Sequence, residues 1–395
     1  MKKPKSIDLF SGCGGLSTGF EKAGFDNVVS NDIWEPAQET FLHNNPSGNF
    51  ILGDIAQAKI KKEIIHKSLG CDVIVGGPPC QAYSLSGGRD VDDPRGRLFE
   101  EYLKIVKKIR PKYFVIENVK GILSMEHDKN NLPPGDQIKL NRIKTLEKRR
   151  SSLLLRRKQS LNTSKIKFTK SDSRILEVTK EELKKVKKNT SDLRVKVTDM
   201  IKERFEKIGY DVKMQVLNAA DYGVPQKRER VIFIGGYDGL PVNFPDQTYR
   251  KKTNGTEDLF KSNLQDWITV REAIDDIKDH PEDIDFNHIF TNCGKEFLNK
   301  IKKTKIGTSV YEGYRDAYYR SYPDEPSNTV KENHGGVFIH YEKNRFMTPR
   351  ELARLQSFED DFIFKGSKSQ ILVQIGNAVP PKLGFEIANT IKEQI

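Results

Sequence analysis

Cysteine, histidine and tryptophan are scarce in this chain of 395 residues, which holds 4 Cys, 7 His and 2 Trp. None of Cys13, Cys71, Cys80 and Cys293 belongs to a CxxC pair, so the ligand spacing of a structural zinc site is missing. Four unclustered cysteines in a chain of this length indicate free thiols. The sequence therefore predicts a protein without a metal centre.

Long apolar runs are also missing. No segment approaches the roughly 18 apolar residues that a membrane helix requires. The basic start of the chain, residues 1–5, leads directly into a strand-like segment without the apolar stretch of a signal peptide. These absences predict a cytoplasmic protein that does not enter a membrane. With 36% hydrophobic and 31% charged residues, the chain has the composition of a polar globular protein.

Positive charge is confined to one segment. Residues 137–196 hold 20 Lys and Arg against 6 Asp and Glu, a net charge of +14. Since the whole chain carries +12, the remainder carries −2. Blocks of this kind contact polyanions or form solubilising, partly disordered insertions. Apolar residues near Ile143 and Leu183 recur with near-helical spacing, which predicts two charged helices.

The first part of the chain alternates strand-like and helix-like segments. Short apolar runs that predict strands lie at residues 6–10, 27–30, 49–52, 72–75 and 113–116, and further strands are expected at 213–217 and 230–234. Helical patterns follow most of them. This alternation predicts an α/β protein with a doubly wound parallel sheet. Residues 237–324 are rich in Gly, Asn, Asp and Pro, which predicts a second domain of irregular structure.

Cys80 stands after two prolines, where the strand 72–75 and Gly76-Gly77 end. Pro78 and Pro79 fix φ and stiffen the backbone. A nucleophilic thiol has to be held rigidly where a substrate atom arrives. A buried free thiol in a tight turn is the other interpretation of this segment. By itself the segment leaves the two interpretations open.

A glycine loop, residues 11–15, joins the first strand to a helix. Glycines allow the backbone to approach a ligand, and a helix N-terminus offers free N–H groups. The loop matches neither the dinucleotide-binding nor the Walker pattern. Asp32 ends the second strand, where a carboxylate can bind ribose hydroxyls, and Asp54 follows the third. Together they indicate a nucleoside cofactor whose tail is not a diphosphate.

Seven segments in order resemble the motifs of DNA (cytosine-5)-methyltransferases of the bacterial restriction-modification type. The resemblance covers most of the chain outside the basic insertion and the variable region. The segments are DLFSGCGG at 8–15, GGPPCQ at 76–81, DPRGRLF at 93–99, ENV at 117–119, QKRER at 226–230, RELARLQ at 350–356 and QIGNAVP at 374–380.

The resemblance implies methyl transfer to C5 of cytosine by a Rossmann-like, S-adenosylmethionine-dependent fold. It makes Cys80 the nucleophile that adds to C6 and Glu117 the carboxyl that protonates or hydrogen-bonds N3. Arg230 would donate to O2 of the base, and Arg228 would support the loop. Arginine suits these roles because its guanidinium is a rigid donor.

The cofactor implied is S-adenosylmethionine, with S-adenosylhomocysteine as the product. Ile33 stands where many relatives carry an aromatic residue, and the neighbouring Trp34 is an uncertain substitute. Cys13 is expected to pack in the cofactor loop. The implied cofactor-binding residues are Phe10, Ser11, Gly12, Cys13, Gly14, Asp32, Ile33, Asp54, Ile55, Leu98, Asn377 and Ala378.

By the same resemblance, the partner is double-stranded DNA, whose target base has to be flipped out of the helix. The expected organisation is a catalytic and cofactor-binding domain at 1–236 with a basic insertion at about 126–196. A target-recognition domain at 237–370 and a C-terminal segment at 371–395, returning to the catalytic domain, follow. Candidate DNA readers lie around 250–254, 287–292 and 308–320. The insertion is expected to contact the DNA backbone, a partner-binding arm being the alternative, and residues 84–89 to be mobile without DNA.

The expected enzyme acts as a monomer and protects host DNA, alongside a cognate restriction endonuclease if one exists. Two other functions stay open at this point. Some relatives with this fold methylate tRNA, although they tend to lack a large recognition region. The other is a DNA-binding module without catalysis, and the presence of Cys80, Glu117 and Arg230 argues against it. The DNA sequence that is recognised cannot be derived from the side chains.

Overall fold

The computed structural model of the protein describes residues 2–79, 94–129, 132–162, 166–252, 263–311, 317–332 and 338–395. These residues form two compact units. The first contains Met1–Pro78, Glu101–Val119 and Ile208–Ile395, and the second contains Pro79–Glu100 and Lys120–Lys207. The predicted division into domains at residues 237 and 371 stays a prediction.

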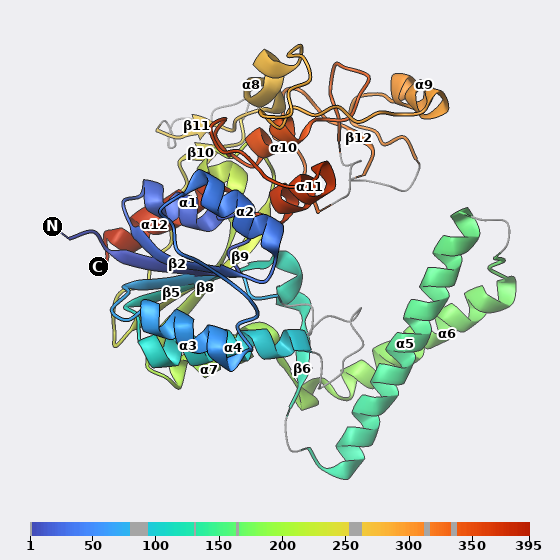
Figure 1. The fold of residues 1–395 in the computed structure, drawn as a ribbon. Helices are drawn as coiled ribbons and strands as arrows, with labels where there is room; N and C mark the ends of the chain where they lie inside the picture. Colours follow the sequence, from blue (N-terminus) through green and yellow to red (C-terminus); the bar gives the residue numbers. More distant parts are fainter. Residues whose placement is uncertain are drawn as a thin grey trace. The chain divides into compact units, whose positions relative to one another are not determined.

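A seven-stranded sheet forms the centre of the first unit (Figure 1). Its order is β3-β2-β1-β4-β5-β9-β8. The strand order reverses between β1 and β4, and in such sheets ligands bind outside the carboxyl ends of the strands at this point. The strands are β1 Lys5–Leu9, β2 Asp26–Asp32, β3 Phe50–Leu52, β4 Val73–Gly76, β5 Tyr113–Val119, β8 Tyr210–Asn218 and β9 Glu229–Tyr237.

Five of these strands are parallel, which agrees with the doubly wound prediction, but the last two are not. β9 runs antiparallel to β5, and β8 runs antiparallel to β9. Only the short segment 219–228 joins β8 to β9, whereas a parallel connection needs a crossover of a dozen or more residues. Because β9 is reversed, its first residues lie at the edge where the parallel strands end.

Helices cover both faces of the sheet (Figure 1). On one face, α1 (Gly15–Lys22) packs against α12 (Pro381–Lys392). Leu16 and Phe20 of α1 join Leu383 and Ile387 of α12 in one apolar cluster with β4 and β5. On the other face, the hydroxyl of Tyr102 in α4 (Pro94–Ile109) donates to the carbonyl oxygens of Ile74 and Val115 at 3.1 and 3.0 Å. The remaining helices before β4 are α2 (Glu35–Asn44) and α3 (Ala58–Lys67).

The segment after β9 contains mostly short elements, in agreement with its irregular composition. It has its own apolar cluster, to which Phe358, Phe364 and Ile375 contribute together with Cys13 of the glycine loop. The cluster therefore joins this segment to the loop after β1. The elements are β10 Tyr249–Arg250, β11 Gln265–Asp266, α8 Val270–Ile274, α9 Lys295–Lys303, β12 Tyr319–Arg320, β13 Phe338–Ile339, α10 Pro349–Leu355 and α11 Lys368–Asn377.

Helices dominate the second unit. The two predicted charged helices are present as α5 (Pro134–Asn162) and α6 (Lys170–Lys188). Strands β6 (Glu126–Asp128) and β7 (Arg194–Lys196) pair antiparallel beside them, and α7 (Val197–Glu206) follows. Throughout the described part of the chain, every helix is too short or too polar to cross a membrane.

The α1–α12 contact leads to a stability prediction. A Cβ added at Gly19 would lie 2.5 Å from the carbonyl oxygen of Pro381 and 2.6 Å from the amide nitrogen of Phe385, both backbone atoms. Since overpacking costs about 1–3 kcal/mol, Gly19→Ala should lower the free energy of unfolding by that amount. At Gly135 an added Cβ meets nothing within 4 Å. Gly135→Ala is the control, and thermal unfolding that ranks the two variants equally would contradict this packing.

Candidate active site at the carboxyl edge of the sheet

The ends of β4 and β5 are tied together at the start of the predicted nucleophile loop. The side-chain amide of Asn118 donates to the carbonyl oxygen of Pro78 at 3.0 Å. A Cβ at Gly77 would lie 3.2 Å from a carboxylate oxygen of Glu117, so glycine allows this close approach. The sequence places Cys80 two residues after Pro78. Cys80 itself, and the loop 84–89 that is expected to be mobile, lie outside the described residues.

Glu117 and Arg230 form an ion pair in which Nε of Arg230 lies 2.7 Å from Oε1 of Glu117. Their side chains are 14% and 11% exposed, respectively. The pairing of Val119 with Arg230 and of Glu117 with Ile232 sets this geometry, because it brings the start of β9 beside the end of β5. Two predicted catalytic residues that are more than a hundred positions apart in the sequence thus meet.

Arg228 is buried and binds mainly backbone, with one longer contact, 3.5 Å, to the side-chain oxygen of Gln226. Its guanidinium donates to the carbonyl oxygens of Val330, Gly376 and Ala378 at 2.9, 3.0 and 2.9 Å. Burial lowers the pKa of Arg228 to about 9, with a further contribution from the charge of Arg230. The side chain links the start of β9 to the end of α11. This geometry is that of a positioning residue; the expected support of the loop stays a prediction.

Two buried glutamines extend the Arg228 contacts, and sequence reasoning did not single them out. The side-chain amide of Gln226 donates to Leu355 O at 3.0 Å and to the Gln356 side chain at 2.9 Å. Gln226 Oε1 accepts from the backbone N–H of Val330 at 2.9 Å. Only their position inside two of the quoted motifs, QKRER and RELARLQ, could have pointed to these glutamines in the sequence.

The glycine loop joins β1 to α1 at the same edge of the sheet. Phe10 has φ 59°, a conformation that costs energy for a residue with a side chain and often marks a functional loop. Gly14 has φ 93°, and an added Cβ would lie 2.8 Å from the ring of Phe41. At Gly15 a Cβ would lie 2.4 Å from the carbonyl oxygen of Val379. The loop therefore packs tightly against α2 and against the segment after α11.

The predicted ribose-binding carboxylate is fixed by this loop. Asp32 accepts from the backbone N–H of Gly12 at 2.9 Å and from that of Trp34 at 3.0 Å. Burial is the largest cause that raises the pKa of Asp32. The next residue, Ile33, is 69% exposed, and Asp54 accepts from the N–H of Ala56 at 2.8 Å. A pair of hydrogen bonds leaves carboxylate lone pairs on Asp32 free for further donors.

The remaining predicted cofactor residues differ in burial and in the elements that carry them. Cys13 and Ile55 are buried, and burial raises the pKa of the Cys13 thiol to about 12. Such a thiol stays protonated, as a packing residue would. Asn377 ends α11, while Ala378 belongs to the apolar cluster that contains Cys13. Leu98 is half-buried in α4.

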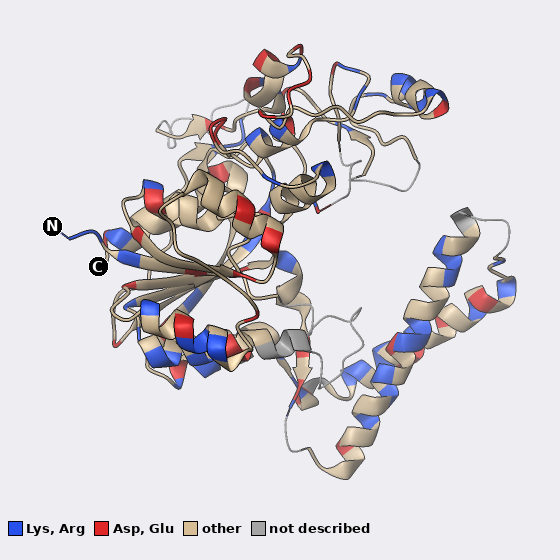
Figure 2. Ribbon diagram, viewed as in Figure 1, with Lys and Arg blue, Asp and Glu red and all other residues tan. Residues whose placement is uncertain are grey.

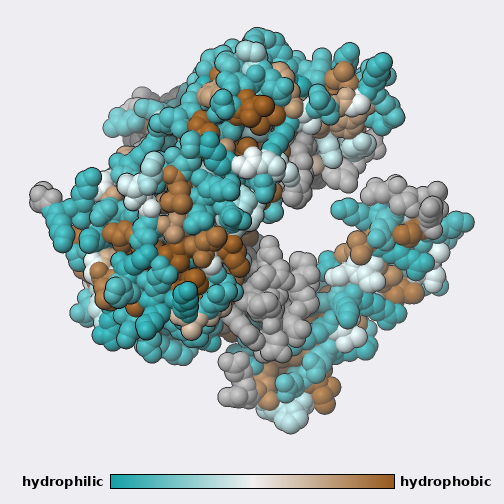
Figure 3. All heavy atoms as spheres, in the orientation of Figure 1, coloured by the Kyte–Doolittle hydropathy of each residue, from teal (hydrophilic) through white to brown (hydrophobic). Residues whose placement is uncertain are grey.

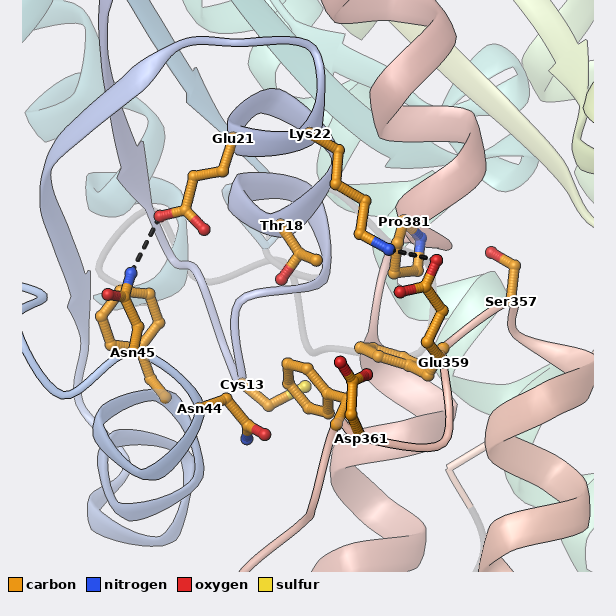
Figure 4. Close-up of a pocket in the computed structure, with 13 residues that line it drawn as sticks. Cys13, Thr18, Glu21, Lys22, Asn44, Asn45, Ser357, Glu359, Asp361 and Pro381 are labelled. Carbon is orange, nitrogen blue, oxygen red and sulfur yellow. Dashed lines mark hydrogen bonds and ion pairs between the residues drawn. The ribbon is translucent and has the colours of Figure 1, made fainter.

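A pocket of about 170 Å³ opens beside the loop, between α1, α2 and the segment 357–362 (Figure 4). Glu21 accepts from the side chain of Asn45 at 2.9 Å, and Lys22 pairs with Glu359 across it. Of the described residues that line the pocket, Cys13 alone is among the predicted cofactor residues. No cluster of three or more His, Cys, Asp or Glu in the described residues could hold a metal ion.

Asp8 is a buried carboxyl that the sequence analysis did not single out. It lies in β1 with 1% of its surface exposed and accepts from the backbone N–H of Ser17 in α1 at 3.1 Å. Burial raises the pKa of Asp8 to about 8, against the opposing effect of the Ser17 hydrogen bonds. Asp8 thus anchors the first turn of α1 from below the glycine loop.

The seven-stranded sheet with helices on both faces is consistent with a Rossmann-like methyltransferase fold. The solved structure of the S. pombe Dnmt2 methyltransferase has a TM-score of 0.55 at 16% identity, with 99% of both chains covered. A DNA modification methyltransferase described from an E. coli prophage has a TM-score of 0.65 at 23% identity, again with 99% of both chains covered. At these identities the likeness concerns the fold.

Sequence comparison identifies the family. The model of the C-5 cytosine-specific DNA methylases matches residues 4–134 and 174–393. The chain is 33% identical to the Type II methyltransferase M1.HphI of Haemophilus parahaemolyticus, covering 98% of this chain and 86% of that protein. It is 31% identical to M.NgoPII of Neisseria gonorrhoeae, with 99% and 96% covered. The chain belongs to the C-5 cytosine-specific DNA methylase family and is a DNA (cytosine-5)-methyltransferase of the restriction-modification type.

The contacts of Arg228 predict a large effect on stability. Arg228→Ala would leave three buried carbonyl oxygens without their donor, so the free energy of unfolding should fall by about 3–5 kcal/mol. The adjacent Lys227 forms a surface ion pair with Glu325. Lys227→Ala should therefore change the free energy of unfolding by less than about 1 kcal/mol. Denaturant unfolding of the two variants measures both values. Equal losses would show that the buried contacts of Arg228 do not hold this part of the structure together.

The raised pKa of Asp8 predicts a pH dependence of stability. The folded state holds the Asp8 proton more tightly than the unfolded state does. Protonated Asp8 therefore contributes to the free energy of unfolding, fully below about pH 4, and this contribution is lost as the pH rises through about 8. Asp8→Asn keeps an oxygen acceptor for Ser17 and does not titrate. Between pH 5 and 9 the melting temperature of the variant should fall less than that of the wild type. Superimposable profiles would contradict the assignment.

Proposed function

We propose that the enzyme transfers a methyl group from S-adenosylmethionine to C5 of a flipped-out cytosine at a specific site in duplex DNA, through a covalent bond between Cys80 and C6. The observation that carries this proposal is the Glu117–Arg230 pair beside Gly77 and Pro78. An acid and a fixed guanidinium thereby stand where the chain leads into Cys80. At most about 7 Å of extended chain separates Pro78 from Cys80.

The chemistry assigns each of these side chains a step. The Cys80 thiolate forms a bond to C6, and the electrons of the C5–C6 double bond shift into the ring and make C5 a nucleophile. Glu117 delivers a proton or a hydrogen bond to N3, and Arg230 donates to O2, so the ring does not accumulate negative charge. After methylation, the C5 proton leaves, and its electron pair expels the Cys80 thiolate and restores the aromatic ring.

The residues around the glycine loop fit the proposed cofactor. S-adenosylmethionine supplies, when bound, an electrophilic methyl group on a sulfonium. The carboxylate of Asp32, held by the N–H groups of Gly12 and Trp34, suits the ribose hydroxyls. Exposed Ile33 offers an aliphatic surface for the adenine, and Asp54 an acceptor for its amine. Phe10, Ser11, Cys13, Gly14, Ile55, Leu98, Asn377 and Ala378 are proposed to complete the site.

Duplex DNA is the proposed substrate, and the segment 237–370 its proposed recognition region. The matched family and the Type II methyltransferases among the relatives support this assignment. We further propose that a monomer acts in the cytoplasm and protects DNA from a cognate endonuclease. Methylation of a random duplex library, read by bisulfite sequencing, tests activity and specificity together. Methylation of tRNA in preference to the duplex library would overturn the choice of substrate.

Covalent catalysis predicts that 5-fluorocytosine traps the enzyme. A fluorine at C5 cannot leave as a proton, so the Cys80–C6 bond should persist in a duplex whose cytosines are replaced by 5-fluorocytosine. With S-adenosylmethionine present, the wild type should form a complex that survives a denaturing gel, and Cys80→Ser should form none. Glu117→Gln should slow methylation by about 10²–10⁴-fold. Methylation by the Cys80→Ser variant at the wild-type rate would refute the mechanism.

A further inference from the structure

Helices α5 and α6 form a helical hairpin that is only partly covered by the family model. The family model leaves residues 135–173 unmatched, which include nearly all of α5 and the first turn of α6. The two helices run antiparallel and bury a small apolar cluster (Figure 1). This helical hairpin is therefore an ordered surface rather than a flexible tail. The cluster comprises Leu140, Ile143, Leu146, Leu183 and Leu193.

Ion pairs neutralise nearly all the acidic residues of the hairpin. The sequences of α5 and α6 contain 16 Lys and Arg against 6 Asp and Glu. Five of these acids have a basic partner within the hairpin. The pairs are Lys139–Asp136, Arg142–Glu182, Arg156–Asp172, Lys180–Glu177 and Lys187–Glu147. Lys144 is paired with Asp128 of β6.

Lys and Arg greatly outnumber Asp and Glu along the hairpin (Figure 2). Eight basic side chains of the hairpin are exposed and have no acidic partner among the residues that the structure describes. A cation already bound to a carboxylate must give up that partner to bind another anion, whereas these eight need not. They are Lys148, Arg149, Arg157 and Lys158 of α5, and Lys170, Arg174, Lys184 and Lys185 of α6.

The four cations of α6 share one side of the helix. At 100° per residue, Lys170, Arg174, Lys184 and Lys185 fall within an arc of roughly 100°. Leu176 and Leu183, which are buried, point to the opposite side. Glu181 lies on the basic side as well, and Glu177 there is paired with Lys180. The side of α6 that faces away from α5 is thus a basic stripe.

We propose that this helical hairpin binds the sugar-phosphate backbone of the duplex DNA that the enzyme methylates, and does so without reading sequence. The inference rests on the proposed function, because it takes duplex DNA as the substrate. Outside residues 137–196 the chain carries a net charge of −2, so the hairpin is its main source of attraction for a polyanion. Phosphate contacts position a protein on DNA and carry no sequence information.

The surface of the hairpin favours a nucleic acid over a protein partner. Its exposed apolar residues, Ile138, Leu154, Leu155 and Val178, are 70, 39, 57 and 58% exposed. In the face shown by Figure 3, hydrophobic residues appear on the hairpin in separate small groups among hydrophilic ones. The dense unpaired charge suits a partner with regularly spaced anions, and a duplex has one about every 1.7 Å along its axis.

The test removes the basic stripe and measures DNA binding by the full-length enzyme. In one variant, Lys170, Arg174, Lys184 and Lys185 are all changed to Gln, a good helix former. The dissociation constant of a random-sequence 40-base-pair duplex is measured from about 50 to 200 mM salt. Each phosphate that the variant no longer neutralises should lower the slope of log K against log salt by about 0.9. We expect a slope smaller by about 2–4 and affinity weakened about tenfold or more.

A matched variant removes the same charge elsewhere. Lys2, Lys3, Lys107 and Lys108 are exposed, and all four lie near the starts of β1 and β5, at the edge of the sheet opposite Glu117. Changing these four to Gln should leave the salt slope within about one unit of the wild-type value. An equal reduction of the slope in both variants would show a general effect of net charge and overturn the proposal, as would an unchanged slope in the stripe variant.

Methylation assays separate this inference from the proposed function. The stripe variant should keep its kcat at saturating duplex, raise KM, and retain the wild-type methylation sites in a random library. Changed methylation sites would mean that the hairpin reads sequence, which contradicts the proposal. The proposal would also be contradicted if the stripe variant lost affinity for RNA but kept its affinity for the duplex, because the partner of the hairpin would then be RNA. If the wild type methylated no duplex, the proposed function would fail, and binding to the duplex would still test the stripe.

Discussion

The pairing of β9 with β5 is the constraint on which the candidate site depends. Because β9 runs antiparallel to its neighbour, its first residues reach the edge where the parallel strands end. Arg230 then meets Glu117, and Arg228, two residues earlier, enters the core and binds the backbone at the end of α11. A parallel β9 would place both arginines at the opposite edge, far from the glycine loop.

Around this edge, hydrogen bonds between side chains and backbone groups fix the positions of the loops. Asn118 holds Pro78, Gly12 and Trp34 hold Asp32, and Arg228 binds three carbonyl oxygens. Contacts of this kind fix the path of the loops that carry the proposed catalytic and cofactor residues. They also explain why side chains with no reacting atom are buried there, since a backbone carbonyl in the core needs a donor.

In the helical hairpin, charge matters more than apolar packing. Its apolar cluster is small, and its cations outnumber its acids by a wide margin. Self-repulsion in such a hairpin opposes folding, and the five ion pairs with its acids offset part of that cost. The cations that remain exposed are the part of the hairpin that an anionic partner can use.

The sequence predicted much of this protein because its signals are local. Apolar runs of four or five residues predicted the strands, and spacing predicted α5 and α6. Spacing alone did not show which apolar residues of these helices are buried. Ile138 and Val178 are 70 and 58% exposed, whereas Ile143 and Leu183 are buried, because helical spacing cannot show which side of a helix meets a partner. Nor did spacing reveal that β8 and β9 are antiparallel, which depends on strand pairing.

By itself, the sequence determined the α/β class, the confinement of positive charge and, through its seven ordered motifs, the family. Those features depend on residue type and order along the chain. The tertiary structure alone decided that Glu117 meets Arg230, that Arg228 binds backbone instead of facing the site, and which hairpin cations are left unpaired. Each of these depends on contacts between residues far apart in the chain, and such contacts form only when the chain packs.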